Sequence, residues 1–177
     1  YGISPKENIV LGTDFMARFD QSRIELTGQA AVSAYNNDIS SGTFDDRYID
    51  SVYTSGAEGI KKARDVLKDY ITVNDNFRPL GLDGLPTLAW EFGVGLNYFD
   101  NALKFTYLYR GNDYTSFGQS FLQTDIRGFS IVDRARIIDN RVFLTLGYER
   151  LQDNTAATKV GTTAFSNGSL TLDLPPR

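Results

Sequence analysis

The sequence predicts an all-β fold: an antiparallel up-and-down meander that forms a β-barrel or a segment of a larger barrel. Three observations support this prediction. Apolar and polar residues alternate over long runs, short turns rich in Asp and Asn join some of these runs, and long polar connections join the others. We expect residues 1–177 to form a single domain, with one short helix inserted in a loop at about residues 55–72.

The clearest alternation runs from Thr87 to Phe99. Trp90, Phe92 and Leu96 fall on one side of this run, and Glu91 falls on the other side together with small residues. Successive side chains of a strand point to opposite faces, so this segment has one apolar face and one small or polar face. The same pattern predicts six more strands, at residues 8–20, 23–35, 102–110, 129–138, 142–148 and 166–174.

The connections between these strands differ regularly in length. Residues 19–22, 99–101 and 138–141 are short turns, whereas residues 35–53, 111–125 and 152–165 are long connections. This asymmetry is typical of up-and-down barrels of the outer membrane. Seven strands is an odd number, whereas bacterial barrels use an even number from about 8 upward. The chain also begins without Met or a signal peptide and ends in Leu174-Pro175-Pro176-Arg177, so we expect a mature chain or an excised piece of a larger barrel.

The predicted helix lies within a loop insertion at residues 55–86. Ser55 and Glu58 have the spacing of a capping box, and Ile60, Ala63 and Leu67, with Tyr70, follow at helical spacing. Basic residues beside this stripe leave two interpretations, a helix on an anionic surface or a helix that packs on its own protein. The stripe is short, which favours the second. Residues 77–86 contain several Pro and Gly, so we interpret them as a connector.

Composition excludes several classes of chemistry. The 177 residues carry a net charge of -4 and include neither Cys nor His. Catalytic Ser-His-Asp triads, Cys-His pairs and His-based zinc sites are therefore excluded, and we expect no cofactor. The acidic balance argues against nucleic acid as a partner. No apolar run is long enough for a membrane-spanning helix, but a barrel strand needs only about 9–11 alternating residues.

The alternation divides the candidate site residues between two faces. We expect the charged residues of the polar face to point into a lumen; these candidates are Glu25, Glu91, Lys104, Arg110, Asp133, Arg134 and Arg136. We expect the apolar face to contact lipid; its candidates are Leu88, Trp90, Phe92, Val94, Leu96, Leu103 and Phe105.

Two sets of carboxylates have a catalytic or metal-binding alternative. Glu91 could serve a carboxylate-based hydrolase, but glycoside hydrolysis needs a second carboxylate at about 5–9.5 Å, and the sequence identifies none. A charge pair between Glu91 and Lys104 or Arg110 is the favoured interpretation. Asp38, Asp45 and Asp46 could bind Ca²⁺, but Asx turns in a solvated loop explain them as well.

The charges at Asp133, Arg134 and Arg136 interrupt the alternation of their strand. They could form an internal ladder of opposite charges, a selectivity ring, or a cluster at the membrane interface. Arg or Lys on a lipid face costs about 2–4 kcal/mol at mid-depth. We therefore favour the inward ladder.

Residues 109–118, 121–134 and 140–154 are the most distinctive stretches. They read YRGNDYTSFG, FLQTDIRGFSIVDR and NRVFLTLGYERLQDN. Together with residues 25–33 and 37–39, they resemble large, poorly characterised outer-membrane β-barrel proteins of Bacteroidota-like Gram-negative bacteria. The resemblance covers most of the chain outside the helical insertion. It implies an architecture and a location in the outer membrane, and it assigns no functional residue.

The sequence therefore predicts an outer-membrane barrel, or part of one, with a structural, pore or surface-assembly role and no catalytic activity. Its expected partners are outer-membrane lipid and further strands or subunits of an envelope assembly. The alternative is a soluble periplasmic or extracellular β-barrel or sandwich, a lipocalin-like carrier with the apolar face turned inward around a small apolar ligand.

Overall fold

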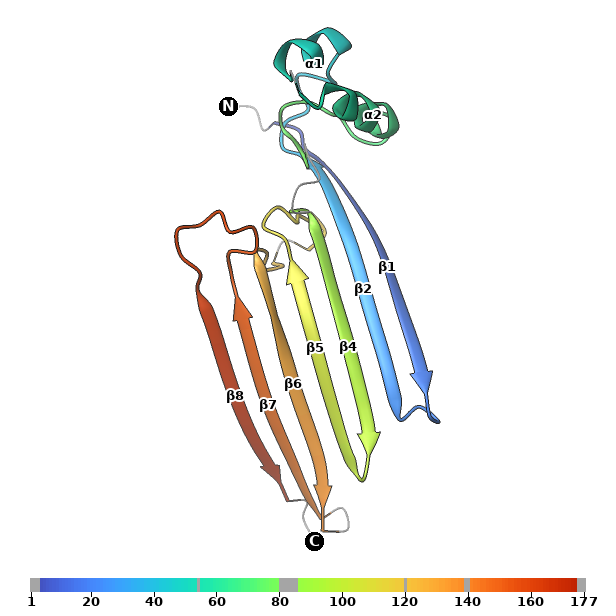
Figure 1. Ribbon diagram of the computed structural model, residues 1–177, viewed down its shortest axis with the longest axis vertical. Helices are drawn as coiled ribbons and strands as arrows, with labels where there is room; N and C mark the ends of the chain where they lie inside the picture. Colours follow the sequence, from blue (N-terminus) through green and yellow to red (C-terminus); the bar gives the residue numbers. More distant parts are fainter. Residues whose placement is uncertain (1–3, 54, 80–85, 120, 139–140, 175–177) are drawn as a thin grey trace.

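The computed structural model describes residues 4–53, 55–79, 86–119, 121–138 and 141–174. Within these residues the chain forms mostly antiparallel sheet with two short helices, as the fold class predicted from the sequence requires (Figure 1). The elements in chain order are β1 (Glu7–Phe19), β2 (Ile24–Asn36), α1 (Asp46–Val52), α2 (Ala57–Leu67), β3 (Phe77–Arg78), β4 (Leu88–Tyr98), β5 (Asn101–Arg110), β6 (Ile126–Ile137), β7 (Val142–Gln152) and β8 (Ala164–Asp173).

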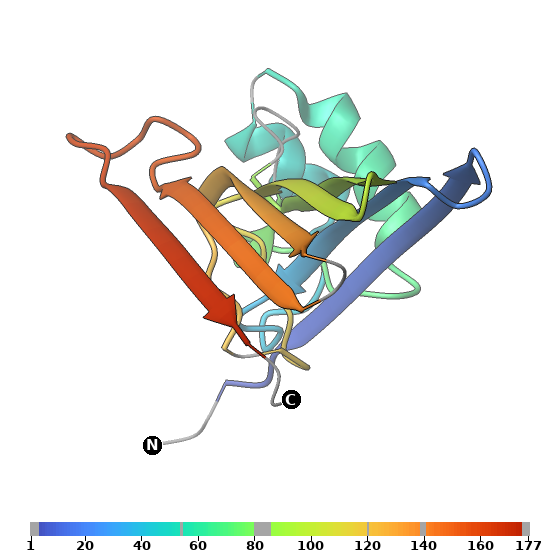
Figure 2. The same ribbon diagram turned by 90° about the horizontal axis from the view of Figure 1, so that it is seen from below.

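The strands form one sheet in the order β1-β2-β4-β5-β6-β7-β8, and the two-residue strand β3 pairs with the end of β2. Every pairing is antiparallel. The sheet is open, because β1 and β8 are at its two edges and do not pair with each other. Figure 2 shows that it bends into a trough, with β4 and β5 near the bend and β1 and β8 at the rims.

The short turns lie at one end of the sheet, and the long connections and both helices lie at the other (Figure 1). The turns at residues 20–22 and 99–100 have positive φ values, between 47° and 67°, for all five residues. Such left-handed backbone joins antiparallel strands without splaying them, and Asn and Asp tolerate it best among non-glycine residues. These two turns confirm the prediction. The third predicted turn includes Asp139 and Asn140, which lie outside the described residues.

The connection between β2 and β4 contains two helices: α2 lies within the predicted insertion at residues 55–86, and α1, which was not predicted, lies before it. Asp45 caps α1 by accepting a hydrogen bond of 2.7 Å from the Tyr48 amide. The helix predicted at residues 55–72 is shorter and begins differently. Gly56, in a left-handed conformation, is the N-cap of α2, and no side chain caps this helix. The predicted Ser55 cap is therefore wrong, and the helix ends at Leu67.

The region after α2 holds the buried core instead of a further helical turn. Ile71, Val73 and Phe77 are at most 3% exposed, and Leu67 packs against them together with Ile9 of β1. This contact agrees with a helix that packs on its own protein. Tyr70 does not share in it, since it is 74% exposed.

The predicted connector at residues 77–86 contains β3, and its residues 80–85 lie outside the described part of the chain. Ion pairs join the two helices: Lys61 to Asp50 and Arg64 to Asp46, both at 2.6 Å. None of the helices described is long and apolar enough to cross a membrane.

Candidate functional site

The strand register sorts the side chains of the sheet onto two faces. On the first face, Leu26 of β2 lies opposite Val94 of β4, which lies opposite Phe105 of β5 and so on across the sheet. All seven lipid-facing candidates share this apolar face: Leu88, Trp90, Phe92, Val94, Leu96, Leu103 and Phe105. The other face carries the small and polar residues.

The polar face is the concave side of the trough. The helices lie on the convex side in Figure 2, and α2 shares a groove with Ile9, Leu11 and Val32, which belong to the apolar face. Glycines occur on the polar face of strands β1, β4, β6 and β7: Gly12, Gly93, Gly95, Gly128 and Gly147. Small residues on this side allow the sheet to curve toward it, because side chains on a concave face crowd one another.

Three of these glycines, at positions 93, 128 and 147, cannot accept a side chain without movement of their neighbours. A Cβ at Gly93 would lie 2.5 Å from the Thr27 hydroxyl oxygen, and a Cβ at Gly128 would lie 2.1 Å from the Arg150 carbonyl oxygen. The contact at Gly128 is the more severe because it involves backbone of the neighbouring strand. The absence of a side chain at these positions therefore allows the neighbouring strands to approach closely.

The loop between β5 and β6 folds over the concave side at the long-loop end. The Thr115 amide donates to the Ser33 hydroxyl at 3.0 Å, and the Phe117 amide donates to the Asn8 Oδ1 atom at 3.1 Å. Asn8 in turn donates to the Thr115 carbonyl at 3.0 Å. These bonds tie the loop to β1 and β2, and Tyr114 of the loop is buried, at 6% exposed.

A cavity of about 480 Å³ lies between this loop and the sheet. A row of directly opposed residues crosses its floor from β1 to β5, namely Asp14, Gln29, Glu91 and Leu108. Arg110 also lines the cavity. Sequence reasoning identified Glu91 and Arg110 but missed Asp14, which only the pairing of β1 with β2 and of β2 with β4 brings into the row.

A second cavity, of about 540 Å³, lies nearer the short turns. Glu25, Lys104 and Arg134 line it with Thr27 and Thr106, so both signs of charge contribute. Glu25 pairs with Arg18 at 2.9 Å. The concave side therefore holds two hollows along its length, in which charged and polar side chains are interspersed with apolar ones such as Leu108 and Val132.

Six of the seven lumen-facing candidates lie on this concave face: Glu25, Glu91, Lys104, Arg110, Arg134 and Arg136. Asp133 was wrongly assigned, because the register places it between Leu103 and Leu146 on the apolar face. The odd-numbered residues of β6 lie on the apolar face, and Asp133 is the only acidic residue among them. Asp133 and Arg134 therefore point to opposite sides.

The expected charge pairs of the concave face are not formed. In the part of the chain that the structure describes, no ion pair joins Glu91 to Lys104 or Arg110, and none joins Asp133, Arg134 or Arg136 to another residue. The register explains this result: Glu91 is opposite Gln29 and Leu108, and Lys104 is opposite Gly95 and Val132. The predicted ladder of opposite charges is therefore wrong.

The calcium candidates are occupied by local contacts. Asp38 accepts hydrogen bonds from the amide and hydroxyl of Ser40, Asp45 caps α1, and Asp46 pairs with Arg64. These bonds lower the pKa of Asp38 and of Asp46 below the ordinary value of a carboxyl group. Among the residues described, no group of three or more acidic side chains is arranged to hold a metal ion.

The apolar face is most exposed at the edges of the sheet and is partly exposed in its centre. Leu11 and Phe15 of β1 are 67% and 54% exposed, and Leu170 of β8 is 69% exposed, whereas Phe92 and Leu103 of the central strands are 37% and 36% exposed. Aromatic rings pack along this face: Trp90 stacks on Tyr107 at 5.3 Å, and Phe105 on Phe129 at 6.2 Å. Helix α2 faces this surface only at the long-loop end, near Ile9 and Val32, and no other described helix or loop covers the rest of it.

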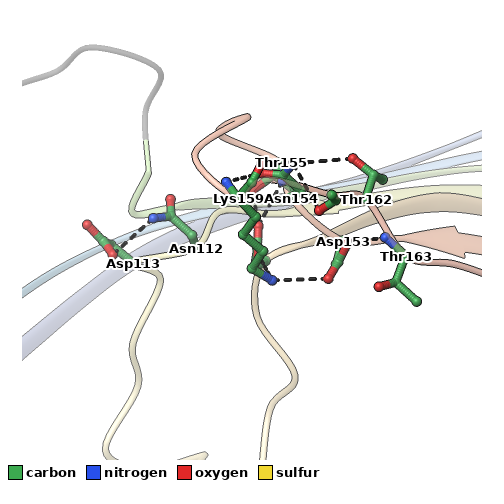
Figure 3. A network of polar contacts seen from close by, with 10 residues as sticks. Asn112, Asp113, Asp153, Asn154, Thr155, Lys159, Thr162 and Thr163 are labelled. Atoms are coloured by element: carbon green, nitrogen blue, oxygen red, sulfur yellow. Dashed lines mark hydrogen bonds and ion pairs between the residues drawn. The ribbon is translucent and has the colours of Figure 1, made fainter.

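A polar network joins the β5–β6 loop to the β7–β8 loop at the long-loop end of the sheet. Figure 3 shows its members from the β7–β8 loop, among them Asp153, Asn154 and Lys159. Asp125 accepts hydrogen bonds from the Thr155 amide and hydroxyl at 2.7 and 2.8 Å, and Lys159 contacts both Asp125 and Asp153, at 2.5 and 3.1 Å. The Asn154 side chain donates to the Lys159 carbonyl at 3.1 Å. The network thus links the β5–β6 loop to the β7–β8 loop.

These contacts perturb the titration of the network. Burial alone would raise the Asp125 pKa, but the hydrogen bonds from Lys159 and Thr155 outweigh it and lower the pKa to about 2. The two carboxylates raise the Lys159 pKa. Sequence reasoning missed this network, because its members come from two loops and are brought together only by the pairing of β6 with β7.

Comparison of the chain with protein-family models, with curated proteins and with solved structures gives no match.

Proposed function

We propose that this chain is an outer-membrane β-barrel protein, or a segment of one, whose apolar face contacts lipid and whose concave polar face lines the interior. The observation that carries the proposal is the exposed apolar band on the convex side of a long-stranded sheet. The seven long strands have 10 to 13 residues each, and about 9–11 residues suffice for a tilted strand to cross the hydrocarbon layer.

Burial energetics support this environment. An exposed apolar face of this extent is unfavourable in water, at roughly 25 cal/mol per Å² of apolar surface that remains solvated. In a bilayer the same face is in contact with acyl chains, and the backbone polar groups are satisfied by strand pairing. The only buried hydrophobic cluster in the described residues, at Ile71, Val73 and Phe77, lies at the long-loop end of the sheet, where Ile9 and Ala34 pack against it, and does not extend along the length of the strands.

The polar interior supports a structural or pore role. Its two cavities, of about 480 and 540 Å³, are lined by both carboxylates and cations, and the β5–β6 loop narrows the trough at the long-loop end. A passage of this kind would prefer small polar solutes. Transport through this interior requires that the open sheet be closed into a barrel.

Cell fractionation and a test of heat-modifiable gel migration check this proposal. The protein, purified from the cell envelope in mild detergent, is run on a denaturing gel with and without boiling. A closed barrel migrates faster before boiling than after it, and the protein is found with the outer membrane. Recovery as a detergent-free, soluble monomer contradicts the proposal.

A soluble carrier for a small apolar ligand is the second candidate, and one observation favours it. A groove of about 710 Å³ lies between α2 and the sheet, lined mainly by apolar residues that include Ile9, Val32, Ile60 and Ala63. Its volume suits a small ligand. A carrier of the lipocalin kind would, however, bind its ligand within the concave side, which is polar here. A hydrophobic molecule that co-purifies with soluble protein would support this second candidate.

A further inference from the structure

The two free edges of the sheet run in the same direction. Six antiparallel pairings connect β1 to β8 through β2, β4, β5, β6 and β7, and each pairing reverses the strand direction. An even number of reversals leaves β8 parallel to β1, and Figure 1 shows both arrows pointing toward the short-turn end. Direct pairing of β1 with β8 would therefore be parallel.

Strand β8 has none of the features that protect a natural edge from pairing. Proteins block exposed edges with proline, with lysine, with bulges or with very short strands. Strand β8 has ten residues, contains no Pro, Lys or Arg, and pairs with β7 in unbroken register from Phe143–Asp173 to Gln152–Ala164. Strand β1 has thirteen residues, no proline and unbroken register with β2. Strand β1 carries the charged residues Asp14 and Arg18 on the polar face, whereas the only charged residue of β8 is Asp173 at its end, so β8 in particular has the properties of an interior strand.

Side-chain exposure at the edges agrees with this interpretation. Apolar-face residues at the edges are 54–69% exposed in the cases of Phe15, Leu11 and Leu170, against 36–37% for Leu103 and Phe92 in the central strands. The central residues have a neighbouring strand on each side, and the edge residues have one on a single side only. The difference is the area that one more amphipathic strand would cover at each edge.

We propose that the sheet is completed by an odd number of amphipathic strands, of which the first pairs antiparallel with β8 and the last antiparallel with β1. This inference rests on the proposed barrel. Closed bacterial barrels are antiparallel throughout with an even strand number, and seven long strands plus an odd number satisfies both conditions. With one added strand, that strand pairs with both edges.

For a chain inserted in a membrane, the same geometry argues against a second copy of the chain as the direct partner. Two copies inserted in one membrane have the same orientation, so all their β1 and β8 strands run the same way. Any direct contact between edges, β8 with β1 or β8 with β8, would be parallel. The completing strands must run in the direction of β2 and β7, with apolar side chains outward at alternate positions to continue the apolar face.

Cysteine pairs test whether the two edges pair directly with each other. The chain contains no Cys, so introduced pairs give no background. Ser169→Cys on β8 is combined in turn with Gly12→Cys, Asp14→Cys and Met16→Cys on β1, all on the polar face, and the protein is purified from the cells that produce it and oxidised. The control pair is Thr145→Cys with Thr171→Cys, which lie directly opposite each other on β7 and β8.

We expect the control pair to form a disulfide and the β1–β8 pairs to form none, within a chain or between chains. At least one intervening strand separates the edges by about 9.6 Å, twice the strand spacing, and a disulfide needs Cβ atoms at about 3.5–4.5 Å. Rapid cross-linking of any β1–β8 pair overturns the proposal, because it requires direct contact between the edges.

Amide hydrogen exchange of the unsubstituted protein provides the second measurement and does not depend on the variants. Completed edges exchange as slowly in β1 and β8 as in the central strand β5. Fast exchange confined to β1 and β8 means that the edges are free and overturns the proposal. Fractionation separates the two proposals, since protected edges in a soluble protein contradict the membrane location and leave strand completion intact.

Discussion

An arginine on the apolar face distinguishes a lipid environment from water. Val94 lies in the interior of β4 on this face, between Leu26 and Phe105 in the register, and its side chain is half-buried. In lipid, arginine near mid-depth costs about 2–4 kcal/mol, so Val94→Arg should shift the unfolding equilibrium about 30- to 700-fold. In water the cost is at most about 1 kcal/mol, because a half-exposed valine loses only part of its burial and the arginine stem restores some contact.

Leu108→Arg is the matched control on the neighbouring strand. Leu108 is also half-buried, but it lies on the concave face opposite Glu91, where a guanidinium gains a charged neighbour. Urea unfolding in lipid vesicles measures both variants. We expect Val94→Arg to destabilise the protein by at least about 2 kcal/mol more than Leu108→Arg. Equal effects, or a cost below about 1 kcal/mol for Val94→Arg, would refute the assignment of the apolar face to lipid.

Two further predictions concern the loop network and the curvature of the sheet. Asp125→Asn should cost up to about 2 kcal/mol at pH 7, since the Asp125 pKa is lowered to about 2. The stability that the Asp125 carboxylate contributes is complete above about pH 4 and is lost as the pH falls toward 2. The unfolding curves of wild type and variant should therefore converge near pH 2. A difference in stability that stays constant with pH would contradict this prediction. Gly128→Ala should destabilise the sheet by about 1–3 kcal/mol, because its Cβ meets the Arg150 carbonyl at 2.1 Å. Gly95→Ala, whose nearest neighbour is at 3.6 Å, should change stability by less than about 0.5 kcal/mol in the same thermal unfolding assay, and equal costs would show that close backbone approach is not what requires glycine.

The sequence predicted the strands well because alternation records the two faces of a sheet directly. It failed where single residues interrupt the pattern. Strand β6 begins at Ile126 and not at Phe129, and Arg127 on the outward face hides that start. Asp133 was placed on the wrong face for the same reason: charge suggested the interior, whereas position in the strand sets the face.

The helices were harder to predict because they depend on contacts distant in sequence. Helix α1 has only seven residues, too few for a periodic pattern, and it is held by the Asp45 cap and by the ion pair from Arg64 to Asp46. The predicted end of α2 failed because Ile71 enters the buried cluster with Val73 instead of extending the helix.

The composition of the candidate site depends on register between strands far apart in the chain. A hairpin turn fixes Asp14 opposite Gln29, but only the pairing of β2 with β4, across the whole helical insertion, adds Glu91 to the row. The placement of the β5–β6 loop similarly depends on Asn8 and Ser33, more than eighty residues earlier. No local pattern records these contacts.

The central claim, that the convex apolar face lies in acyl chains, is tested most directly at Trp90. It is the single tryptophan of the chain and lies on this face, so its fluorescence reports one position. In vesicles that contain lipids brominated along the acyl chain, the account predicts strong quenching of Trp90 and little quenching by aqueous iodide. Emission that iodide quenches and brominated lipid leaves unchanged would contradict it.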